Sequence, residues 1–367
     1  MLNEVSHTSF AGRLIAWQKV HGRHDLPWQN TRDPYAIWVS EIMLQQTQVS
    51  AVIGYYQRFM RRFPTIAALA AAEQEEVMQH WSGLGYYSRA RNLHAAAQRI
   101  MDEHDGHFPQ NFDAVQNLPG IGRSTAAAIV SFAFDQRQPI LDGNVKRVLA
   151  RHYLIEGWPG LPKVEKQLWA LVEELLPATE MVAYTQGVMD LGATLCTRAK
   201  PQCSLCPLQQ TCQAYALGKW QQLPTSKPRK VSPEKHTVML LLLRGNEVLL
   251  EKRPPRGIWG GLWSLPESAG EDNPEAVAEQ RYGLLAETLP PLPTLSHAFT
   301  HFRLHIKPQP MRVAAIKPEA REAGIVWLPL DDVIGAALPT PVRKLLLQIK
   351  RQPELPFSQI TAFNSSA

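Results

Sequence analysis

The four cysteines of this chain constrain its fold more than any other feature of the sequence. Cys196, Cys203, Cys206 and Cys212 lie within 17 of its 367 residues, in the spacing C-x6-C-x2-C-x5-C. Four thiols this close together predict a metal or iron–sulfur site, because disulfide bonds are unusual inside cells. Structural zinc usually takes two C-x2–4-C pairs, of which this segment has one. The spacing favours a [4Fe–4S] cluster on a short helical wrap, with zinc or unligated buried thiols as the alternatives.

Helical periodicity dominates the chain before these cysteines and around them. Asp33-Pro34 is typical of a helix start, with Asp as the cap and Pro at the first helical position. The segment Leu84–His104 has one apolar face and predicts an amphipathic helix. Clusters of Gly and Pro separate these segments, and no long alternating strand pattern occurs before residue 230. The first part of the chain is therefore predicted to be all-α.

The periodicity changes after a segment rich in Pro and Lys/Arg, QLPTSKPRKVSPEK. That composition is typical of an extended linker. Beyond it, His301–Lys307 alternates strictly between polar and apolar residues, as a strand does, and Pro341–Ile349 looks helical. We therefore predict an α+β domain after the linker. The expected organisation is a helical region at 1–221 with the cysteine loop at 196–212, a linker at 222–235, an α+β domain at 236–352 and a disordered tail at 353–367.

Composition excludes several classes of protein. The chain is 45% hydrophobic and 19% charged, which excludes a wholly disordered protein. Its apolar runs are too short for a membrane span, and its first residues lack the pattern of a signal peptide, so we expect a cytoplasmic protein. The formal net charge of +5 permits a polyanionic partner without proving one.

A glycine-rich turn joins two helical segments at Leu118-Pro-Gly-Ile-Gly122, followed by Arg-Ser-Thr and a run of small residues. Backbone N–H groups at the start of the second helix would suit a phosphate, and Gly allows close approach of the backbone. The ordinary alternative is a plain connection between helices.

Two carboxylates stand out against their surroundings. Glu41 interrupts an apolar helical stretch, where an uncompensated carboxylate is costly if buried. Asp142, in Leu141-Asp142-Gly143-Asn144, stands where a helix N-cap belongs, and such an Asp is usually structural. The residues Gln-Gln-Thr-Gln after Glu41 suit the edges of nucleic-acid bases, although they also fit a polar helix end.

A fourth motif, Gly83-Leu-Gly-Tyr-Tyr-Ser-Arg-Ala-Arg91, combines two aromatic residues with two arginines. These residues could stack on bases and bind phosphates. The alternative is a helix start with its Tyr pair in the core.

Together these motifs resemble the helix–hairpin–helix, Gly-Pro-Asp superfamily of DNA glycosylases, and within it the adenine DNA glycosylases of the MutY type. The resemblance covers nearly the whole chain. The segments that carry it are 26–28, 41–49, 83–94, 118–129, 141–151, 189–208 and 299–301.

The resemblance implies a multi-domain fold, with an all-α helix–hairpin–helix glycosylase region, a [4Fe–4S] cluster loop and an α+β Nudix-like domain. It implies a base-excision repair enzyme that hydrolyses the N-glycosidic bond of adenine mispaired with 8-oxoguanine or guanine. Adenine would be flipped out of the duplex, because the bond cannot be reached inside the base stack. The partner would be double-stranded DNA with such mispairs. We expect a monomer that associates with the nucleoid through DNA and not with membranes.

Each site residue is carried over from the family's motifs. Glu41 matches the general acid and base, whose pKa must be raised for it to hold a proton near neutral pH. Asp142 matches the carboxylate that stabilises an oxocarbenium-like sugar, and Asn144 a residue bonded near that sugar and Asp142. The remaining matches are Trp28, Gln29 and Gln186 in the adenine pocket; Gln46 and Tyr86 at the base stack; Thr47 and Ser124 among the substrate-binding residues; Phe299, Thr300 and His301 at 8-oxoguanine; Gly120 and Gly122 at the phosphate; and the four cysteines at the cluster.

The sequence departs from related patterns at three places. Ser124 stands where bifunctional relatives have a Schiff-base Lys, which implies a monofunctional glycosylase, although Lys146 lies near Asp142 in sequence. Thr300 stands where the family usually has Ser. The catalytic Nudix box, which binds Mg²⁺ through carboxylates, is degenerate: counting from Gly261 and Glu267, its later positions hold Glu275, Ala276, Glu279 and Gln280.

Three rival functions follow from parts of the sequence. The last domain alone suggests a nucleotide pyrophosphatase, against which the degenerate box counts. The cysteines alone suggest a DNA-binding or electron-transfer protein, which would not need Glu41 or Asp142. A thymine-glycol or abasic lyase of the same superfamily is disfavoured by Ser124 and the extra domain.

Overall fold

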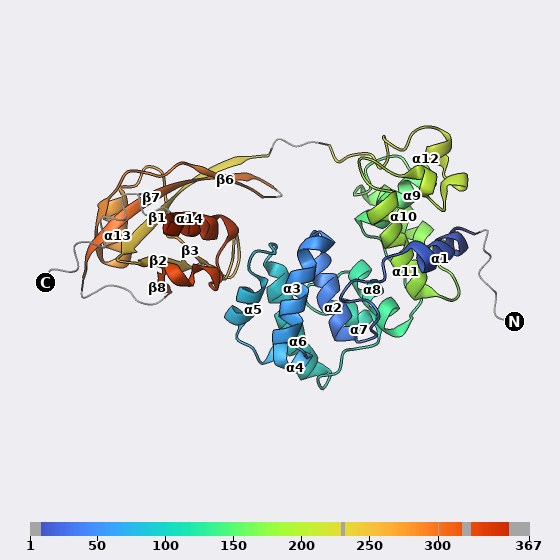
Figure 1. Cartoon of the computed structure of the whole chain (residues 1–367), viewed down its shortest axis with the longest axis horizontal. Coiled ribbons are helices and arrows are strands. Elements are labelled where there is room, and N and C mark those ends of the chain that lie inside the picture. Colours follow the sequence, from blue (N-terminus) through green and yellow to red (C-terminus); the bar gives the residue numbers. More distant parts are fainter. Residues whose placement is uncertain (1–8, 229–231, 300, 318–323, 352–367) are drawn as a thin grey trace. The chain divides into compact units, whose positions relative to one another are not determined.

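A computed structural model describes residues 9–228, 232–299, 301–317 and 324–351 (Figure 1). The chain divides into two compact units, of which the first is Met1–Ala71 with Asn92–Arg229 and the second is Ala72–Arg91 with Lys230–Ala367. The second unit thus includes a segment, 72–91, that the sequence assigned to the helical region. Of the helices in the described ranges, none has the length and apolarity that crossing a bilayer requires.

The first unit is helical, as predicted. Helix α6 (Ser88–Glu103) has its first residues in the second unit and the rest in the first. The other helices of the first unit are α1 (Phe10–His21), α2 (Pro34–Leu44), α3 (Val49–Arg62), α4 (Ile66–Ala70), α7 (Phe112–Gln116), α8 (Arg123–Phe134), α9 (Gly143–His152), α10 (Pro162–Glu174), α11 (Met181–Asp190), the π-helix η1 (Leu191–Leu195), the short 3-10 helices η2 (Cys203–Leu205) and η3 (Gln209–Thr211), and α12 (Gln213–Ala216).

Short polar side chains begin several of these helices. The carboxylate of Asp33 accepts the Tyr35 N–H before α2, and the Ser9 hydroxyl accepts the Gly12 N–H before α1. The start at Asp33 was predicted from the sequence. The helix predicted from Leu84 begins only at Ser88, because Gly85 and Tyr86 adopt positive φ angles of 80° and 49°, which no right-handed helix can contain.

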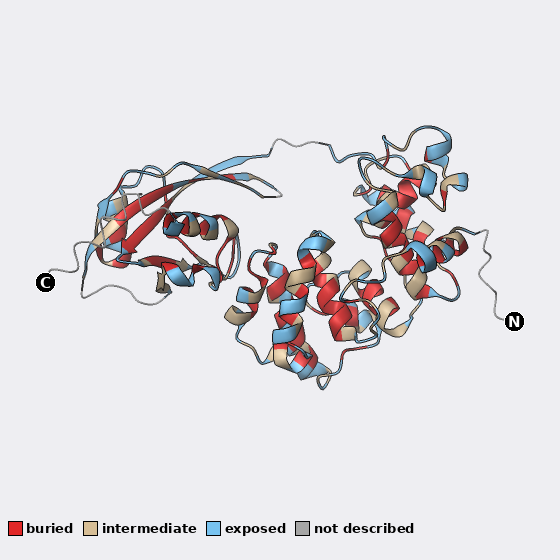
Figure 2. Cartoon of the chain, viewed as in Figure 1, coloured by how far each residue is buried: buried red, intermediate tan, exposed pale blue. Residues whose placement is uncertain are grey.

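Helix α2 is one of the most deeply buried elements of the first unit, and its residues 35–40 are all buried (Figure 2). Trp38, Val39 and Met43 have no exposed surface. Helix α8 packs against α2, and its residues 126–130 are buried and mostly small. Small side chains let the two backbones approach closely, so the side chains at the rim of this contact are held in defined positions.

The second unit contains a mixed eight-stranded sheet, in which the path β3-β2-β1-β7-β5 is extended by β4 on β1, β6 on β7 and β8 on β2. The longest contact joins β1 and β7 in parallel, with His236 opposite His305. The strands are β1 (Glu234–Arg244), β2 (Glu247–Lys252), β3 (Trp263–Ser264), β4 (Glu267–Ser268), β5 (Leu284–Thr288), β6 (Leu295–Ala298), β7 (Arg303–Ile316) and β8 (Ile325–Pro329).

Residues 239–243 of β1 are all buried, so both faces of the sheet are covered at its centre. Helix α13 (Pro274–Tyr282) packs on the face that carries Leu240 and Leu242. Helix α14 (Thr340–Arg351) packs beside the 3-10 helix η4 (Leu330–Ile334). The α+β class predicted for this domain is confirmed.

Helix α5 (Gln74–Trp81) also belongs to the second unit. The Glu75 carboxylate accepts bonds from Lys252 Nζ and Trp263 Nε1, each at 2.6 Å. Just after the helix, Arg343 Nη2 donates to the Ser82 hydroxyl at 2.6 Å. These contacts between distant parts of the sequence explain why the segment 72–91 groups with the sheet.

Two predicted boundaries in the second unit differ from the structure. Strand β1 starts at Glu234, inside the predicted linker, because its parallel pairing with β7 begins there. Strand β7 starts at Arg303 and not at His301, and it continues to Ile316 through a contact with β5 that alternation over seven residues could not reveal.

Candidate active site

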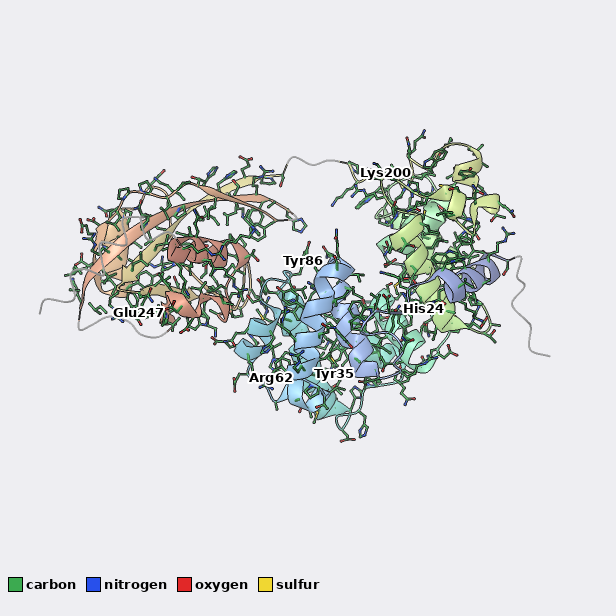
Figure 3. All side chains as sticks on the ribbon, viewed as in Figure 1. His24, Tyr35, Arg62, Tyr86, Lys200 and Glu247 are labelled. Carbon is green, nitrogen blue, oxygen red and sulfur yellow. The ribbon has the colours of Figure 1, made fainter. Side chains whose placement is uncertain are left out.

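A cleft of about 920 Å³ lies within the first unit. Its walls come from the loop before α2, from α2 itself, from the starts of α8 and α9, and from α11. His24, labelled in Figure 3, belongs to this lining. Eight of the residues predicted for the site line the cleft: Trp28, Gln29, Glu41, Thr47, Ser124, Asp142, Asn144 and Gln186.

Glu41 reaches the cleft from the middle of the buried helix α2, between Ile37 and Leu44 on the same face. Burial raises the pKa of its carboxyl from an ordinary 4.5 to about 8, and the negative charge of Asp142 adds to the shift. A carboxyl with this pKa is protonated at neutral pH, so Glu41 can act as an acid there.

Asp142 caps helix α9, as the sequence predicted, with its Oδ1 accepting the Val145 N–H at 2.7 Å. Its Oδ2 accepts a bond from Asn144 Nδ2 at 3.3 Å. Burial raises the pKa of Asp142, while the hydrogen bonds from Val145 and Asn144 and the charge of Arg147 oppose that rise. The two carboxyls of the cleft thus have different surroundings: the one of Asp142 has donors aimed at its charged form.

A hydrogen-bonded chain runs from Asp142 toward the first cysteine. Asn144 bonds to Asp142, and its Oδ1 accepts from Arg147 Nη2 at 2.7 Å. Arg147 Nε in turn donates to the backbone carbonyl of Cys196 at 2.7 Å. A Cβ on Gly192 would lie 2.6 Å from the Asn144 Cβ, so only glycine allows η1 to lie this close. Arg147 and Gly192 were not predicted from the sequence; the helical spacing of Arg147 from Asn144 was the available signal.

Two glutamines and a tryptophan are among the residues that line the cleft. The Trp28 ring is buried and lies edge-on to Tyr56, with 5.3 Å between centroids. Gln29 accepts the Leu26 N–H at 3.1 Å through its Oε1. Gln186 donates from Nε2 to Asp190 at 2.9 Å. Each amide is therefore held at one end by the protein.

Ser124 and Lys146 have definite partners. The Ser124 hydroxyl accepts the backbone N–H of Leu141 at 3.0 Å, which ties the start of α8 to the residue before Asp142. The Lys146 ammonium lies 2.6 Å from the Glu165 carboxylate. Ser124 borders the cleft, whereas Lys146 is not among the residues that line it.

Gln46 and Tyr86, predicted to contact the base stack, lie outside the cleft lining and share one backbone property. Both have positive φ angles, 57° for Gln46 and 49° for Tyr86, which costs a residue with a Cβ of order 1–3 kcal/mol. Tyr86 is labelled in Figure 3 and is 45% exposed, and the Arg89 guanidinium lies over its ring. Strained and exposed residues of this kind are common at sites that contact ligands.

The predicted phosphate turn has two glycines in different environments. Gly120 has a φ of +78°, and a Cβ there would lie 2.7 Å from the Asn92 Cβ. Gly122 is the N-cap of α8, and open space surrounds the position of its missing Cβ. Gly120 is thus needed by the fold, while Gly122 leaves the first N–H groups of α8 accessible.

The four cysteines line one small cavity together with Arg151 and His152. Arg151 Nη1 donates to the Cys196 sulfur at 3.4 Å. Burial, together with the charges of the neighbouring sulfurs, raises the pKa of Cys206 to about 12. Among the described residues, no three His, Cys, Asp or Glu side chains are grouped as ligands of one metal ion. The donor set itself, four thiols with a guanidinium beside one sulfur, fits a centre bound through thiolates.

The residues predicted to contact 8-oxoguanine belong to the second unit. The Phe299 ring stacks on Phe302 with 4.5 Å between centroids and also contacts Trp259. His301 is exposed, just before β7. Thr300 lies outside the described residues. An aromatic cluster therefore supports the loop at its first residue.

The carboxylates at the degenerate Nudix positions are engaged within the second unit. Glu267 forms an ion pair with Arg253 at 2.8 Å, and Glu279 forms one with Lys317. The Glu275 carboxylate accepts the backbone N–H of Thr288 at 3.0 Å. These side chains connect the strands and helix of the domain.

Comparison with known proteins identifies both parts of the chain. The family model of the HhH-GPD superfamily of base excision DNA repair proteins matches residues 39–174, and that of the NUDIX domain matches residues 237–348. A thermostable thymine-DNA glycosylase of known structure superimposes with a TM-score of 0.52 and 30% identity, over 57% of this chain and 95% of that one. Fold and sequence together define a DNA glycosylase of the helix–hairpin–helix class with an appended Nudix-like domain.

Full-length relatives narrow this class. The adenine DNA glycosylase of Buchnera aphidicola subsp. Acyrthosiphon pisum is 37% identical over 93% of this chain and 98% of its own length. The human adenine DNA glycosylase is 34% identical over 92% of this chain and 73% of its own length. The chain belongs to the adenine DNA glycosylase family.

Proposed function

We propose that this glycosylase hydrolyses the N-glycosidic bond of adenine mispaired with 8-oxoguanine or guanine, and leaves an abasic site in an intact strand. The observation that carries the proposal is the pair of carboxyls in one cleft, Glu41 with its pKa raised to about 8 and Asp142 with hydrogen bonds to its charged form.

Adenine reaches the cleft by flipping out of the duplex, since the glycosidic bond is inaccessible inside the stack. Protonated Glu41 donates its proton to a ring nitrogen of adenine, which makes the base a better leaving group. Asp142 remains charged and stabilises the positive charge that develops on the sugar. The deprotonated Glu41 then accepts a proton from the attacking water. Two carboxyls with opposite protonation states are the arrangement that glycoside hydrolysis requires.

Asn144 and Arg147 act on this reaction indirectly. Asn144 donates to the Asp142 carboxylate, and Arg147 holds the amide of Asn144 in the orientation that permits it. Trp28 supplies an apolar surface against which a flipped base can stack, and Gln29 and Gln186 supply polar atoms for its edge. Ser124 belongs to the same wall of the site.

Strand cleavage is outside this reaction because a Schiff base needs an amine. Ser124 has a hydroxyl, and it is bonded to the Leu141 N–H. The amine of Lys146 is paired with Glu165 at 2.6 Å. We therefore infer a monofunctional enzyme.

Selection of the opposing base involves a second group of residues. Gln46, Thr47 and Tyr86 contact the stack around the mispair, and the strained backbone of Gln46 and Tyr86 supports this role. Phe299, Thr300 and His301 read the edge at which 8-oxoguanine differs from guanine. The rings of Trp259 and Phe302 around Phe299 support a preformed loop.

Cys196, Cys203, Cys206 and Cys212 would hold a [4Fe–4S] cluster, and we assign the loop 196–212 to it. When bound, the cluster would join the four cysteines of this loop by covalent bonds. Such a cross-link would stabilise a segment whose described helices are very short. The Arg151 guanidinium donates a hydrogen bond to the Cys196 sulfur. Iron and zinc analysis of the purified protein separates this assignment from a zinc site, which would give one zinc per chain and no iron.

Single-turnover kinetics test the proposed reaction directly. Duplexes carrying adenine opposite 8-oxoguanine, guanine or thymine are incubated with excess enzyme and analysed with and without alkali. We expect fast adenine release opposite 8-oxoguanine, slower release opposite guanine, and strand breaks only after alkali. Breaks before alkali would contradict the monofunctional assignment, and equal rates opposite all three bases would contradict the assignment to mispairs.

The phosphate turn has its own matched pair of variants. Gly122→Ala places a methyl group in open space at the N-terminus of α8, so the protein should fold and bind duplex DNA more weakly. Gly120→Ala should destabilise the fold through the contact with Asn92 and the positive φ. Normal DNA affinity of folded Gly122→Ala would exclude these N–H groups as a phosphate site.

A further inference from the structure

Asp190 is the last residue of α11 and has no exposed surface. Arg23 holds its carboxylate at two points: Nε donates to Oδ1 at 2.6 Å, and the backbone N–H donates to Oδ2 at 2.9 Å. Arg23 also lines the cleft. A buried carboxylate with this many donors is fixed in both position and orientation.

The same carboxylate fixes the amide of Gln186. Asp190 Oδ1 accepts from Gln186 Nε2 at 2.9 Å. A carboxylate paired with a guanidinium only accepts hydrogen bonds, so the amide must turn its NH₂ group toward Asp190. The acceptor Oε1 is thereby turned away from Asp190, on a residue that lines the cleft.

Gln29, which also lines the cleft, is held with the opposite polarity. Its Oε1 accepts the Leu26 N–H at 3.1 Å. The NH₂ group is therefore the end of this amide that can donate to a ligand. The two glutamines thus offer one acceptor and one donor. Adenine presents the complementary pair, an amino group at C6 and ring nitrogens that accept beside it.

We propose that Asp190, clamped by Arg23, is a positioning residue that sets the cleft to accept 6-aminopurines and to reject 6-oxopurines. This rests on the proposed function of adenine release. In hypoxanthine, the 6-oxygen would face Gln186 Oε1 as a second acceptor, and its N1–H would face the Gln29 donor. Without the clamp, the Gln186 amide could turn over and offer its NH₂ group to that oxygen, so the rejection would be lost.

The test is the ratio of single-turnover excision rates for adenine and hypoxanthine in otherwise identical duplexes. Purine, which has neither substituent at C6, serves as the reference base for general damage to the site. Asp190→Asn replaces one of the two carboxylate oxygens by an NH₂ group. The side chain can then no longer accept hydrogen bonds from Arg23 and Gln186 at both of its ends. We expect the adenine-to-hypoxanthine ratio to fall by roughly 5- to 100-fold, the range for one mismatched buried hydrogen bond, with a smaller change for purine.

A double-mutant comparison shows whether Asp190 acts through Gln186. Gln186→Met keeps the length of the side chain and removes the acceptor, so it should lower the same ratio by itself. Adding Asp190→Asn to Gln186→Met should then lower the ratio no further. If Asp190→Asn does not fold, Arg23→Lys replaces it, because a lysine keeps the charge and the backbone N–H but loses the guanidinium that donates to Oδ1.

The outcomes separate the inference from the proposed function. Equal slowing of all three bases in the Asp190 or Arg23 variants, with an unchanged ratio, would overturn the positioning role and leave adenine release intact. An unchanged ratio in Gln186→Met would overturn it as well. Failure of the wild type to release adenine from any duplex would instead reject the proposed function.

Discussion

The two units use the same functional group in opposite ways. In the cleft of the first unit, burial raises the pKa of Glu41, and the negative charge of Asp142 raises it further. In the second unit, Glu267 lies against Arg253 and Glu279 against Lys317. The first arrangement opposes ionisation of Glu41, whereas the second places each carboxylate in an ion pair.

The contrast indicates which carboxyls of the chain can take part in acid–base chemistry. A carboxyl can transfer a proton at neutral pH only if its environment disfavours the charged form, which costs stability. A carboxylate beside a cation at a partly exposed site is instead suited to connecting secondary structure elements. In the Nudix-like domain, the acidic positions of the degenerate box form contacts within the domain.

The largest expected effect contrasts Glu41→Gln with Glu267→Gln. Glutamine is nearly isosteric with glutamate and can neither donate nor accept the catalytic proton. We expect Glu41→Gln to retain DNA binding and to lose about 10²–10⁴-fold in single-turnover adenine release. Glu267→Gln, the matched control in the second unit, should release adenine at the rate of the wild type.

Binding assays on the same mispaired duplex decide whether Glu41→Gln has lost chemistry or affinity. Near-normal excision by Glu41→Gln would remove this residue from the mechanism. A loss in Glu267→Gln as large as that in Glu41→Gln would end the contrast between the two units.

The sequence predicted the parts of the site that depend on local rules. Asp33 and Asp142 were predicted as helix caps from their neighbours, and Glu41 was singled out because it interrupts an apolar helix. Both caps are confirmed. The α-helical region and the following α+β domain were likewise predicted correctly, because their periodicities differ.

Contacts between distant residues could not be predicted in this way. Arg23 and Asp190 are separated by 167 residues, and Arg147 and Cys196 by 49. Each pair depends on helix packing that no local pattern encodes. The helix predicted from Leu84 starts late because Gly85 and Tyr86 adopt positive φ angles, which the apolar spacing of the segment does not reveal.

The pH dependence of excision should sharpen the contrast. Glu41 must be protonated to act as the acid, and its pKa of about 8 lies above the ordinary 4.5. The single-turnover rate should therefore fall as pH rises through about 8, approaching a tenfold loss per pH unit above it. The contribution of Glu41 to the free energy of unfolding changes with pH in the same direction. Because its pKa is raised from 4.5 to about 8 on folding, this contribution is fully present below about pH 4.5 and is lost as pH approaches 8.

Urea unfolding of the wild type and of Glu41→Gln, across the same pH range, checks the second statement. The variant should gain stability relative to the wild type as pH rises from 4.5 to 8, because its amide does not ionise. A rate that stays constant from about pH 7 to about pH 10 would show that Glu41 does not supply the proton.

The smallest expected effect is the loss of an ion pair in the second unit. Arg253→Met keeps most of the apolar stem and removes the charge that faces Glu267. The side chains of this pair are 21% and 30% exposed, so the loss of unfolding free energy should be at most about 1 kcal/mol. Lys317→Met, at a pair with exposures of 41% and 46%, should cost less still, since solvent screens it more. Urea unfolding measures both losses, and adenine release should stay within about twofold of the wild type because neither residue lies in the first unit. A tenfold slower reaction in a folded Arg253→Met protein would mean that the carboxylates of the Nudix-like domain take part in the chemistry, and the distinction between the two units would then fail.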